Sequence, residues 1–405
     1  MIFAALASGR STLSGVLESE DTLATLRACE QLGASVEHTH KSIHVTGTGG
    51  ELRRPDGGFL DMGNSCTAMR LLAGVLCGQD FDCSLGGDAS LNRRPMKRIV
   101  APLTLMGANI TATGQGTAPL HIRPSGGLRG IEYCSPVASA QIKSCVLLAG
   151  LFASGTTRVL EPRLSRDHTE RMLPLFGVEL PAVCVVRGGS RLEAANFTIP
   201  GDISSAVFLL AAAAINRDSE VILNGVGLNP TRTGLLVCME EMGANLKIRN
   251  QTDSETEPVA DIQVVFSGRL RGIDVPESRV PDMIDELPLL MALAATSTGI
   301  TRIRGAAELR VKESDRLGVM ATGLRNLGVS LKEYPDGMDI QGGVISGGRV
   351  ESAADHRCAM SFALLGLIAD TPVQVGGAEY IATSYPGFVN DLKTLGATVR
   401  SGGSV

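Results

Sequence analysis

The stretch TLATLRACEQLGASV, residues 22–36, shows how this chain is built. Its first part has the apolar spacing of an amphipathic helix, and Gly33 stands where that helix would end. A glycine just after a helix adopts the left-handed backbone conformation and turns the chain into its next element. The residues SIHV (42–45) then alternate as in a strand. The stretch therefore predicts a helix, a glycine turn and a strand.

The same phrase occurs six times: an apolar residue, Gly, Ala or Val, any residue, and an apolar residue. The copies LGASV, MGANI, FGVEL, MGANL, LGVSL and LGATV carry Gly33, Gly107, Gly177, Gly243, Gly328 and Gly396. Glycine is common in unrelated helix-to-strand loops, but spacings of 66 to 85 residues favour a repeated unit. We interpret the chain as an α/β protein of six βα-type units of roughly 70 residues each.

The length of the chain predicts more than one domain. A chain of 405 residues, 44% of them hydrophobic, exceeds the size at which a single core keeps growing. We expect two domains of three units, residues 1–198 and 199–405, because NFTIPGD restarts the chain at Pro200-Gly201. Small-molecule sites usually lie where domains meet, which predicts a ligand cleft between them. The apolar run AVFLLAAAAI (206–215) is expected to form a buried helix.

Composition excludes several classes of function. The net charge is -5 and there is no Trp, which argues against a nucleic-acid partner. No apolar run reaches the length of a membrane span, about 18 residues, and the N-terminus lacks the basic start of a signal peptide. Nine scattered Cys in apolar surroundings indicate reduced packing cysteines, so we predict a cytoplasmic protein without membrane contact.

Zinc spacing is absent from the sequence, and we predict no metal site. The histidines His38, His40 and His44 would share one face of a strand in VEHTHKSIHV (36–45). We interpret them as a polar sheet face rather than as metal ligands.

Polar or cationic side chains stand at helix starts in the N-terminal half. In DMGNSCTAMRLLAG (61–74), free amides at the start of the helix could hold an anion, and an ordinary N-cap explains the pattern equally well. The segment GGDASLNRRPMKRIV (86–100) crowds Arg93, Arg94, Lys97 and Arg98, which suit either an anionic ligand or solvent.

Two further helix starts follow in the same half. In SPVASAQIKSCVLLAG (135–150), Ser139, Gln141 and Lys143 could bind a polyol or a phosphate, although capping alone would explain Ser139. In EPRLSRDHTERM (161–172), Asp167 and Glu170 favour the helix dipole. A cation such as Arg166 is disfavoured at a helix start unless an anion lies nearby.

The C-terminal half adds acids to the cations. VPDMIDELPLLMALAA (280–295) places Asp282, Asp285 and Glu286 before an apolar helix, where a carboxylate can be a general base or an N-cap. In ELRVKESDRLGVMATGL (308–324), Lys312 and Arg316 are four residues apart and would share a helix face. They suit a bound phosphate, or salt bridges to Glu313 and Asp315. ADHRCAMSFALLGL (354–367) carries Asp355, His356 and Arg357 at another helix start.

Taken together and in order, these segments resemble the 5-enolpyruvylshikimate-3-phosphate (EPSP) synthase family over nearly the whole chain. The resemblance rests on GNSCTAMRLL, GDASLNRRPM, SAQIKS, SRDHTERM, PGDISSAVF, MIDELP, ELRVKESDR, DHRCAMSFALLGL and TSYPGF. SAQIKS together with MIDELP is similar to the class II bacterial branch. The resemblance implies the enolpyruvyl transferase fold, two domains of three βαβαββ units that close on substrate. It also implies a monomer without cofactor, which transfers the enolpyruvyl group of phosphoenolpyruvate to the 5-hydroxyl of shikimate 3-phosphate and releases phosphate.

The resemblance also implies roles for individual residues. Shikimate 3-phosphate would be held by Ser139, Ala140, Gln141, Arg166, Asp285 and Lys312. Phosphoenolpyruvate would be held by Asn64, Cys66, Arg94, Gln141, Arg316 and Arg357. Asp285 would accept the proton of the 5-hydroxyl, Glu313 would handle the proton on the methylene carbon, and Lys312 would bridge substrate and phosphate.

The sequence departs from the family at three places. The Lys-Ser-x-x-x-Arg segment that the family carries ahead of an AALA helix has no counterpart, because Met1 falls inside that helix. The first strand of the C-terminal-half domain is expected to be missing with it, and activity impaired. Cys66 replaces the family's Gly, or the Ala of glyphosate-tolerant members, which predicts weaker glyphosate inhibition. TSYPGF has Ser384 and Tyr385 in place of a family Lys.

Two alternatives stay open. A non-catalytic remnant would explain the missing segment, but it would not need the remaining cationic residues. The related transferase that acts on UDP-N-acetylglucosamine shares the fold, carries a catalytic Cys on a loop, and lacks the combination of VKESDR and NRRPM.

Overall fold

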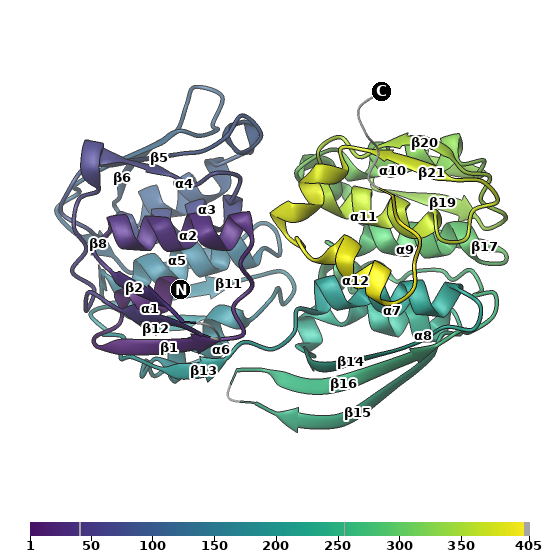
Figure 1. Ribbon diagram of the computed structural model, residues 1–405. Helices are drawn as coiled ribbons and strands as arrows, with labels where there is room; N and C mark the ends of the chain where they lie inside the picture. The colour runs from purple at the N-terminus through teal and green to yellow at the C-terminus, as the bar shows by residue number, and fades with distance from the viewer. Residues whose placement is uncertain (40–41, 255, 401–405) are drawn as a thin grey trace. The chain divides into compact units, whose positions relative to one another are not determined.

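The computed structural model describes residues 1–39, 42–254 and 256–400. Its internal contacts divide the chain into two compact units, residues 1–199 (unit 1) and 200–405 (unit 2) (Figure 1). Among the described residues, each unit has a hydrophobic core built from its own side chains. Each unit is described by itself below.

Unit 1 combines buried inner helices with outer helices that bury one face. The inner helices are α1 (Ile2–Leu6), α3 (Cys66–Leu76) and α5 (Ala140–Leu151). The outer helices are α2 (Glu20–Gln31), α4 (Lys97–Leu105) and α6 (His168–Leu175). Short 3-10 helices are η1 (Asp56–Gly58) and η2 (Leu91–Arg93). The inner helices α3 and α5 pack on each other so closely that Gly74 of α3 leaves no room for a Cβ against the Cys145 carbonyl.

In each of the three larger sheets of unit 1, a central strand pairs with a parallel strand on one side and an antiparallel strand on the other. One sheet has the order β4 (Phe59–Asp61), β5 (Cys83–Gly86), β7 (Leu120–Arg123), β6 (Asn109–Thr111). A second has β13 (Asn196–Thr198), β1 (Arg10–Ser14), β3 (Ser42–Thr46), β2 (Ser35–His38). A third has β12 (Val185–Arg187), β11 (Thr156–Leu160), β9 (Glu132–Cys134), and β10 (Ala153–Ser154) pairs with β8 (Leu128–Arg129).

The second repeat shows the predicted βαβαββ order in full, as β4, α3, β5, α4, β6 and β7. Its first strand, β4, runs parallel to β5. The strand β13 runs parallel to β1 in the same way, although it lies at the end of the unit. The sheet of the first repeat is thus completed by the last strand of unit 1.

Unit 2 repeats the same layering. Its inner helices are α7 (Ile203–Ile215), α9 (Leu287–Thr296) and α11 (His356–Leu365). Its outer helices are α8 (Gly234–Glu241), α10 (Arg316–Asn326) and α12 (Phe388–Thr394). The 3-10 helices are η3 (Pro230–Arg232), η4 (Glu277–Met283), η5 (Ala307–Val311) and η6 (Ala378–Thr383). The apolar run at 206–215 lies in α7, which confirms the predicted buried helix.

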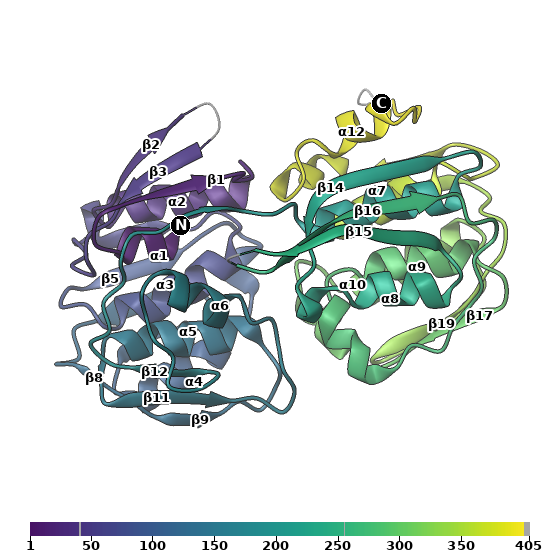
Figure 2. The same cartoon turned by 90° about the horizontal axis from the view of Figure 1, so that it is seen from below.

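The sheets of unit 2 face these helices. They are β14 (Glu220–Gly227), β16 (Pro258–Val265), β15 (Asn245–Asp253); then β17 (Ile300–Ile303), β19 (Gly337–Gln341), β18 (Leu331–Tyr334); and β20 (Gly348–Glu351) with β21 (Val373–Gly376). Figure 2 shows β14, β16 and β15 side by side along α7.

The predicted glycine turn is confirmed in all six copies. The six glycines have φ between 79° and 112° and directly follow the C-caps of the outer helices α2, α4, α6, α8, α10 and α12. In each copy the Ala or Val after the glycine donates its N–H to the carbonyl five residues earlier, as Ala34 does to Cys29 at 3.1 Å. This is the Schellman arrangement, which satisfies the last carbonyls of a helix.

The strand predicted after each turn forms in four copies only. No strand directly follows Gly177, and residues 397–400 after Gly396 form none. The single strand predicted for VEHTHKSIHV is also wrong, because β2 ends at His38 and β3 begins at Ser42. His38 pairs with Ile43 across this hairpin, so His38 and His44 belong to different strands. His40 lies outside the described residues.

All nine cysteines are free and eight of them are buried, as predicted; Cys134 is exposed. Within the described ranges, no helix is both long and apolar enough to cross a membrane. Over the same residues, no three His, Cys, Asp or Glu side chains lie where they could hold one metal ion.

Candidate active site

The predicted residues of unit 1 meet at the N-terminal ends of α3 and α5. Arg94 donates from Nη2 to Oδ1 of Asn64 at 2.7 Å. Gln141, in the first turn of α5, donates from Nε2 to Oγ1 of Thr67 at 2.8 Å, and its carbonyl oxygen accepts from Arg70. Residues up to 77 positions apart in sequence thus form one polar cluster at two helix starts, although the sequence pattern treated them as separate motifs.

The start of α3 has the N-cap that its sequence allowed. Ser65 is the N-cap, and its side chain accepts from the Ala68 N–H at 3.4 Å. Cys66 is the first helical residue and is buried. Among the crowded cations that follow, only Arg94 is buried; Arg93 and Lys97 are exposed.

The third and fourth motifs meet at the neighbouring end of α5. Ser139 is the N-cap residue of α5 but makes no side-chain capping bond, so capping does not account for its hydroxyl. Ala140 begins the helix, and the half-buried Arg166 lies in the loop before α6. The side chain of Lys143 is fully buried and pairs with Glu161 and Glu170.

In unit 2 the predicted acids and cations form a second cluster. Lys312 Nζ lies 3.4 Å from Oδ1 of Asp285, and Arg316 Nη1 lies 3.2 Å from the same oxygen. Glu313 accepts from Nη2 of Arg316 at 2.5 Å. The shared helix face predicted for Lys312 and Arg316 is wrong, because η5 ends at Val311 and α10 begins only at Arg316. A bend between the two elements brings both cations to Asp285.

Arg316 lies at the centre of this cluster. Its side chain is 1% exposed, and its Nε donates to Oδ2 of Asp355 at 2.7 Å. Burial acts to lower the pKa of Arg316, but Asp355, Glu313 and Asp285 outweigh it and raise that pKa well above its usual value. The guanidinium is therefore a permanent buried cation. Asp315, the other salt-bridge partner considered, pairs with Arg310 instead.

A network of hydrogen bonds holds the side chain of Arg357. Arg357 Nη1 donates to Oε1 of Glu286 at 3.0 Å, and the same oxygen accepts from the Ser204 hydroxyl. Arg232 donates to that hydroxyl at 2.5 Å and to Asp202 at 2.8 Å. Glu286 makes no capping bond to α9, so the N-cap alternative does not hold for it.

The charge of Asp202 follows from the same neighbours. Desolvation acts to raise its pKa, but the Arg232 and Arg357 guanidinium groups and a hydrogen bond from Ser205 lower it to about 2. Arg232 and Glu161 were missed from the sequence. Arg232 lies in the 3-10 helix η3, which carries no recognisable motif. Glu161 lies before a loop, and a single acid in that position gives no sequence signal.

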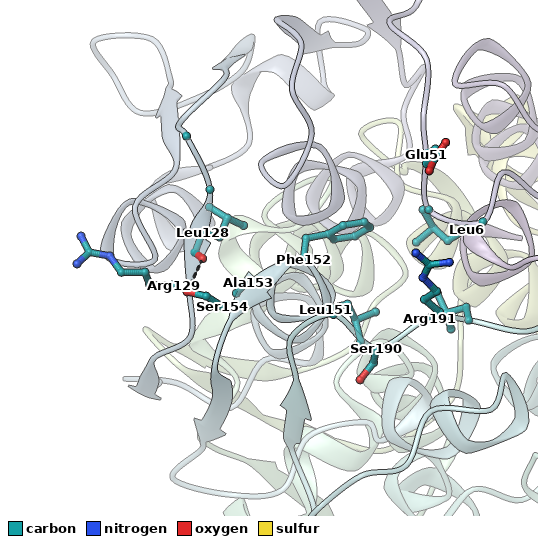
Figure 3. A pocket seen from close by; sticks show the side chains of 16 residues that line it. Leu6, Glu51, Leu128, Arg129, Leu151, Phe152, Ala153, Ser154, Ser190 and Arg191 are labelled. Atoms are coloured by element: carbon teal, nitrogen blue, oxygen red, sulfur yellow. Dashed lines mark hydrogen bonds between the residues drawn. The ribbon is translucent and has the colours of Figure 1, made fainter.

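A cavity of about 800 Å³ lies elsewhere in unit 1 (Figure 3). It is lined by Leu151 to Ser154 at the C-terminal end of α5, whereas Gln141 stands at the N-terminal end. Figure 3 shows Glu51 and Arg191 at one side of it. None of the predicted site residues lines this cavity.

Two compact α/β bodies with six repeated helix–glycine turns, and with acids and cations at the starts of their inner helices, fit the enolpyruvyl transferase class. The family model described as "EPSP synthase (3-phosphoshikimate 1-carboxyvinyltransferase)" matches residues 1–392, and the chain belongs to this family.

Individual relatives agree with the family. The 3-phosphoshikimate 1-carboxyvinyltransferase of Xanthomonas axonopodis pv. citri is 49% identical over 407 aligned residues, covering 100% of this chain and 92% of that protein. The enzyme of the same name from Xanthomonas euvesicatoria pv. vesicatoria is 51% identical over 392 residues, covering 96% and 89%. The solved structure of EPSP synthase from Acinetobacter baumannii has a TM-score of 0.86 and 45% identity, covering 98% of this chain and 92% of that one.

Proposed function

We propose that this chain transfers the enolpyruvyl group from phosphoenolpyruvate to the 5-hydroxyl of shikimate 3-phosphate and releases phosphate. Family membership supports the reaction. The observation that carries the assignment of residues is the cluster of Asp285, Lys312, Glu313 and Arg316, in which an acid lies within 3.4 Å of two cations.

Each residue of the cluster has a proposed role. Asp285 takes the proton of the 5-hydroxyl, whose oxygen bonds to C2 of phosphoenolpyruvate. Glu313 handles the proton that the methylene carbon gains and then loses. Lys312 bridges the substrate and the phosphate, which leaves when its bond to C2 breaks. Cations are suited to this step because they stabilise the charge on the departing phosphate.

Binding is assigned to residues of both units. Ser139, Ala140, Gln141 and Arg166, together with Asp285 and Lys312, hold shikimate 3-phosphate. Asn64, Cys66, Arg94, Gln141, Arg316 and Arg357 hold phosphoenolpyruvate. Guanidinium groups match phosphate and carboxylate geometry, which supports the assignment of the three arginines. We infer further that the protein acts as a cytoplasmic monomer without cofactor, so light scattering should give a mass near 42.3 kDa.

Phosphate release from phosphoenolpyruvate, with and without shikimate 3-phosphate, tests the proposal. In the Asp285→Asn variant we expect kcat to fall by about 10²- to 10⁴-fold, the usual contribution of a general base. The matched control is Asp274→Asn, because Asp274 forms an exposed ion pair with Arg302 in the same unit. We expect this control to keep the parent rate.

The assay is run on the 405-residue chain and on the same chain with a Lys-Ser-x-x-x-Arg segment placed ahead of Met1. Shikimate-3-phosphate-dependent release in either form supports the proposal. Release in neither form favours the non-catalytic remnant. Release that requires UDP-N-acetylglucosamine instead would contradict the proposed substrate.

A further inference from the structure

The buried lysine of unit 1 has no place in the reaction described above. Lys143 lies in α5, and its side chain is 0% exposed. Its Nζ lies 3.1 Å from Oε2 of Glu161 and 2.8 Å from Oε1 of Glu170, and it donates to the Ser165 carbonyl at 3.3 Å. Both glutamate side chains are also buried, 5% and 7% exposed.

The network buries the charged Lys143 side chain at a position where an apolar side chain would stabilise the fold equally well. Burial acts to lower the pKa of Lys143, but Glu170 and Glu161 outweigh it and raise that pKa, so the lysine keeps its charge. Buried ion networks of this kind add little net stability compared with hydrophobic side chains of similar volume. Their use is therefore to be sought in what they hold in place.

Glu161 connects this network to the backbone of two predicted substrate segments. Its Oε1 accepts the Ser139 N–H at 2.9 Å, at the first turn of α5. Its two oxygens also accept from the Ser165 hydroxyl at 2.7 and 2.9 Å, and Oε2 accepts the Ser165 N–H at 3.3 Å. One carboxylate thus ties the start of α5 to the residue before Arg166.

Glu170 and its neighbours attach α6 to the same network. Glu170 lies in the first turn of α6 and accepts from the Cys184 thiol at 3.1 Å. Beside it, Thr169 and Ser144 share a hydrogen bond of 2.6 Å between α6 and α5. Buried polar contacts therefore hold the N-terminal ends of both α5 and α6. The predicted interpretation of Glu170 as a helix-dipole partner is incomplete, because its side chain pairs with Lys143.

We propose that Lys143, Glu161 and Glu170 are positioning residues of the shikimate 3-phosphate site. They hold the turn at Ser139–Gln141 and the loop at Ser165–Arg166 in one fixed arrangement. The inference rests on the function proposed above, which assigns both segments to this substrate.

The variant that tests the inference is Glu161→Gln. Glutamine keeps the volume of the side chain, but its NH₂ group must face either Lys143 Nζ or the Ser139 N–H, so one set of bonds is lost. We expect the KM for shikimate 3-phosphate to rise about tenfold or more, as for loss of a charge-assisted hydrogen bond. The KM for phosphoenolpyruvate should change by less than about threefold, because its other ligands are untouched.

One further variant grades the effect, and a second is set aside. Ser165→Ala removes only the hydroxyl contacts of Glu161 and should raise the KM for shikimate 3-phosphate by less than Glu161→Gln does. Lys143→Met would leave two buried carboxylates without a cation and is expected to unfold the unit, so it does not carry the test.

Controls separate positioning from stability. Glu132→Gln alters an exposed pair with Arg158 on the neighbouring strand and should change neither KM nor the melting temperature. Leu103→Ala removes a fully buried side chain of α4 and should lower the melting temperature without a selective rise in the shikimate 3-phosphate KM. Hydrogen exchange at the Ser139 amide should be faster in Glu161→Gln than in either control.

The outcomes are distinct. Equal rises in both KM values, or a lower melting temperature with unchanged KM values, would overturn the positioning role while leaving the proposed function intact. A parent chain that neither binds shikimate 3-phosphate by calorimetry nor releases phosphate would overturn the proposed function, and this inference with it.

Discussion

Cys66 begins α3, buried between the N-cap Ser65 and the rest of the helix. The function proposed above places Cys66 beside phosphoenolpyruvate, where the family resemblance predicts a smaller residue. If so, the Cys66 side chain would crowd a ligand that fills the same space. We expect Cys66→Gly to be inhibited by glyphosate at about tenfold lower concentration, the scale of one relieved overpacking contact.

Inhibition curves of phosphate release, measured at fixed phosphoenolpyruvate, check this expectation. The matched control is Cys77→Ala, because Cys77 is buried at the opposite end of α3. Its curve should superimpose on that of the parent. Superimposable curves for Cys66→Gly and the parent would show that the Cys66 side chain does not crowd the inhibitor.

His356 lies between Asp355 and Arg357 at the start of α11 and is 8% exposed. Burial, with help from Arg357 and Arg316, lowers its pKa to about 4. The unfolded chain therefore binds a proton below pH 6.5 that the folded chain binds only near pH 4. This difference costs stability as the pH falls through that window.

We expect the free energy of unfolding to lose about 2 kcal/mol from this residue between pH 7 and pH 5. In His356→Gln that loss should be absent, so the pH dependence of the variant should be shallower. Urea denaturation at the two pH values measures the difference. Parallel pH profiles for parent and variant would contradict the assignment to His356.

Much of the candidate site could be proposed at this scale, because the motif residues stand at or near helix starts. Their partners far along the chain could not be. Glu286 was considered as a base or a cap, and it instead accepts from Arg357 and Ser204, 71 and 82 positions away. Such pairings depend on how inner helices pack, which no local pattern contains.

At the scale of elements, helix packing depends on a few small residues. Gly323 of α10 faces the ring of Phe362 in α11, and a Cβ at this position would overlap that ring. Overpacking of this kind typically costs about 1–3 kcal/mol, which exceeds the helix propensity that alanine gains. Gly323→Ala should therefore lower the melting temperature.

Gly343→Ala is the matched control, because a Cβ there meets nothing within 4 Å. Thermal unfolding followed by circular dichroism should show a fall for Gly323→Ala and an unchanged midpoint for Gly343→Ala. A stabilised Gly323→Ala variant would mean that Phe362 has room to move aside.

The glycine turns and the strands after them differ in how local they are. The Schellman turn closes on bonds within six residues, so its pattern was sufficient in every copy. A strand needs a partner strand as well, and the segments after Gly177 and Gly396 alternate without forming one beside the turn. The antiparallel pair β2 and β3 was predicted as one strand, because apolar and polar residues alternate in the same way in both strands.

At the scale of the whole molecule, unit 1 has its own sheets and its own hydrophobic core. Its last strand, β13, returns to β1, pairing Leu13 with Phe197, and the Phe197 ring meets that of Phe176 at 6.0 Å. We expect residues 1–199 to fold alone, with a cooperative thermal transition. Shortening this fragment to residues 1–190 removes β13 and should lower the midpoint by at least about 5 °C.

Circular dichroism melts of the two fragments make the comparison. A fragment 1–199 without a cooperative transition would mean that unit 1 needs unit 2 to fold. Equal midpoints for both fragments would mean that β13 adds nothing to the sheet.

The sequence alone determined the repeat, the glycine turns, the buried helices and the family, because these depend on residues close together in the chain or on motifs in a fixed order. Tertiary structure alone decided which charges far apart in the sequence meet. Lys143 pairs with acids 18 and 27 residues further on, and Arg316 with an acid 39 residues away. An ion pair depends on the distance between side chains in space, and in this protein that distance is set by the packing of inner helices that the sequence pattern describes only one at a time.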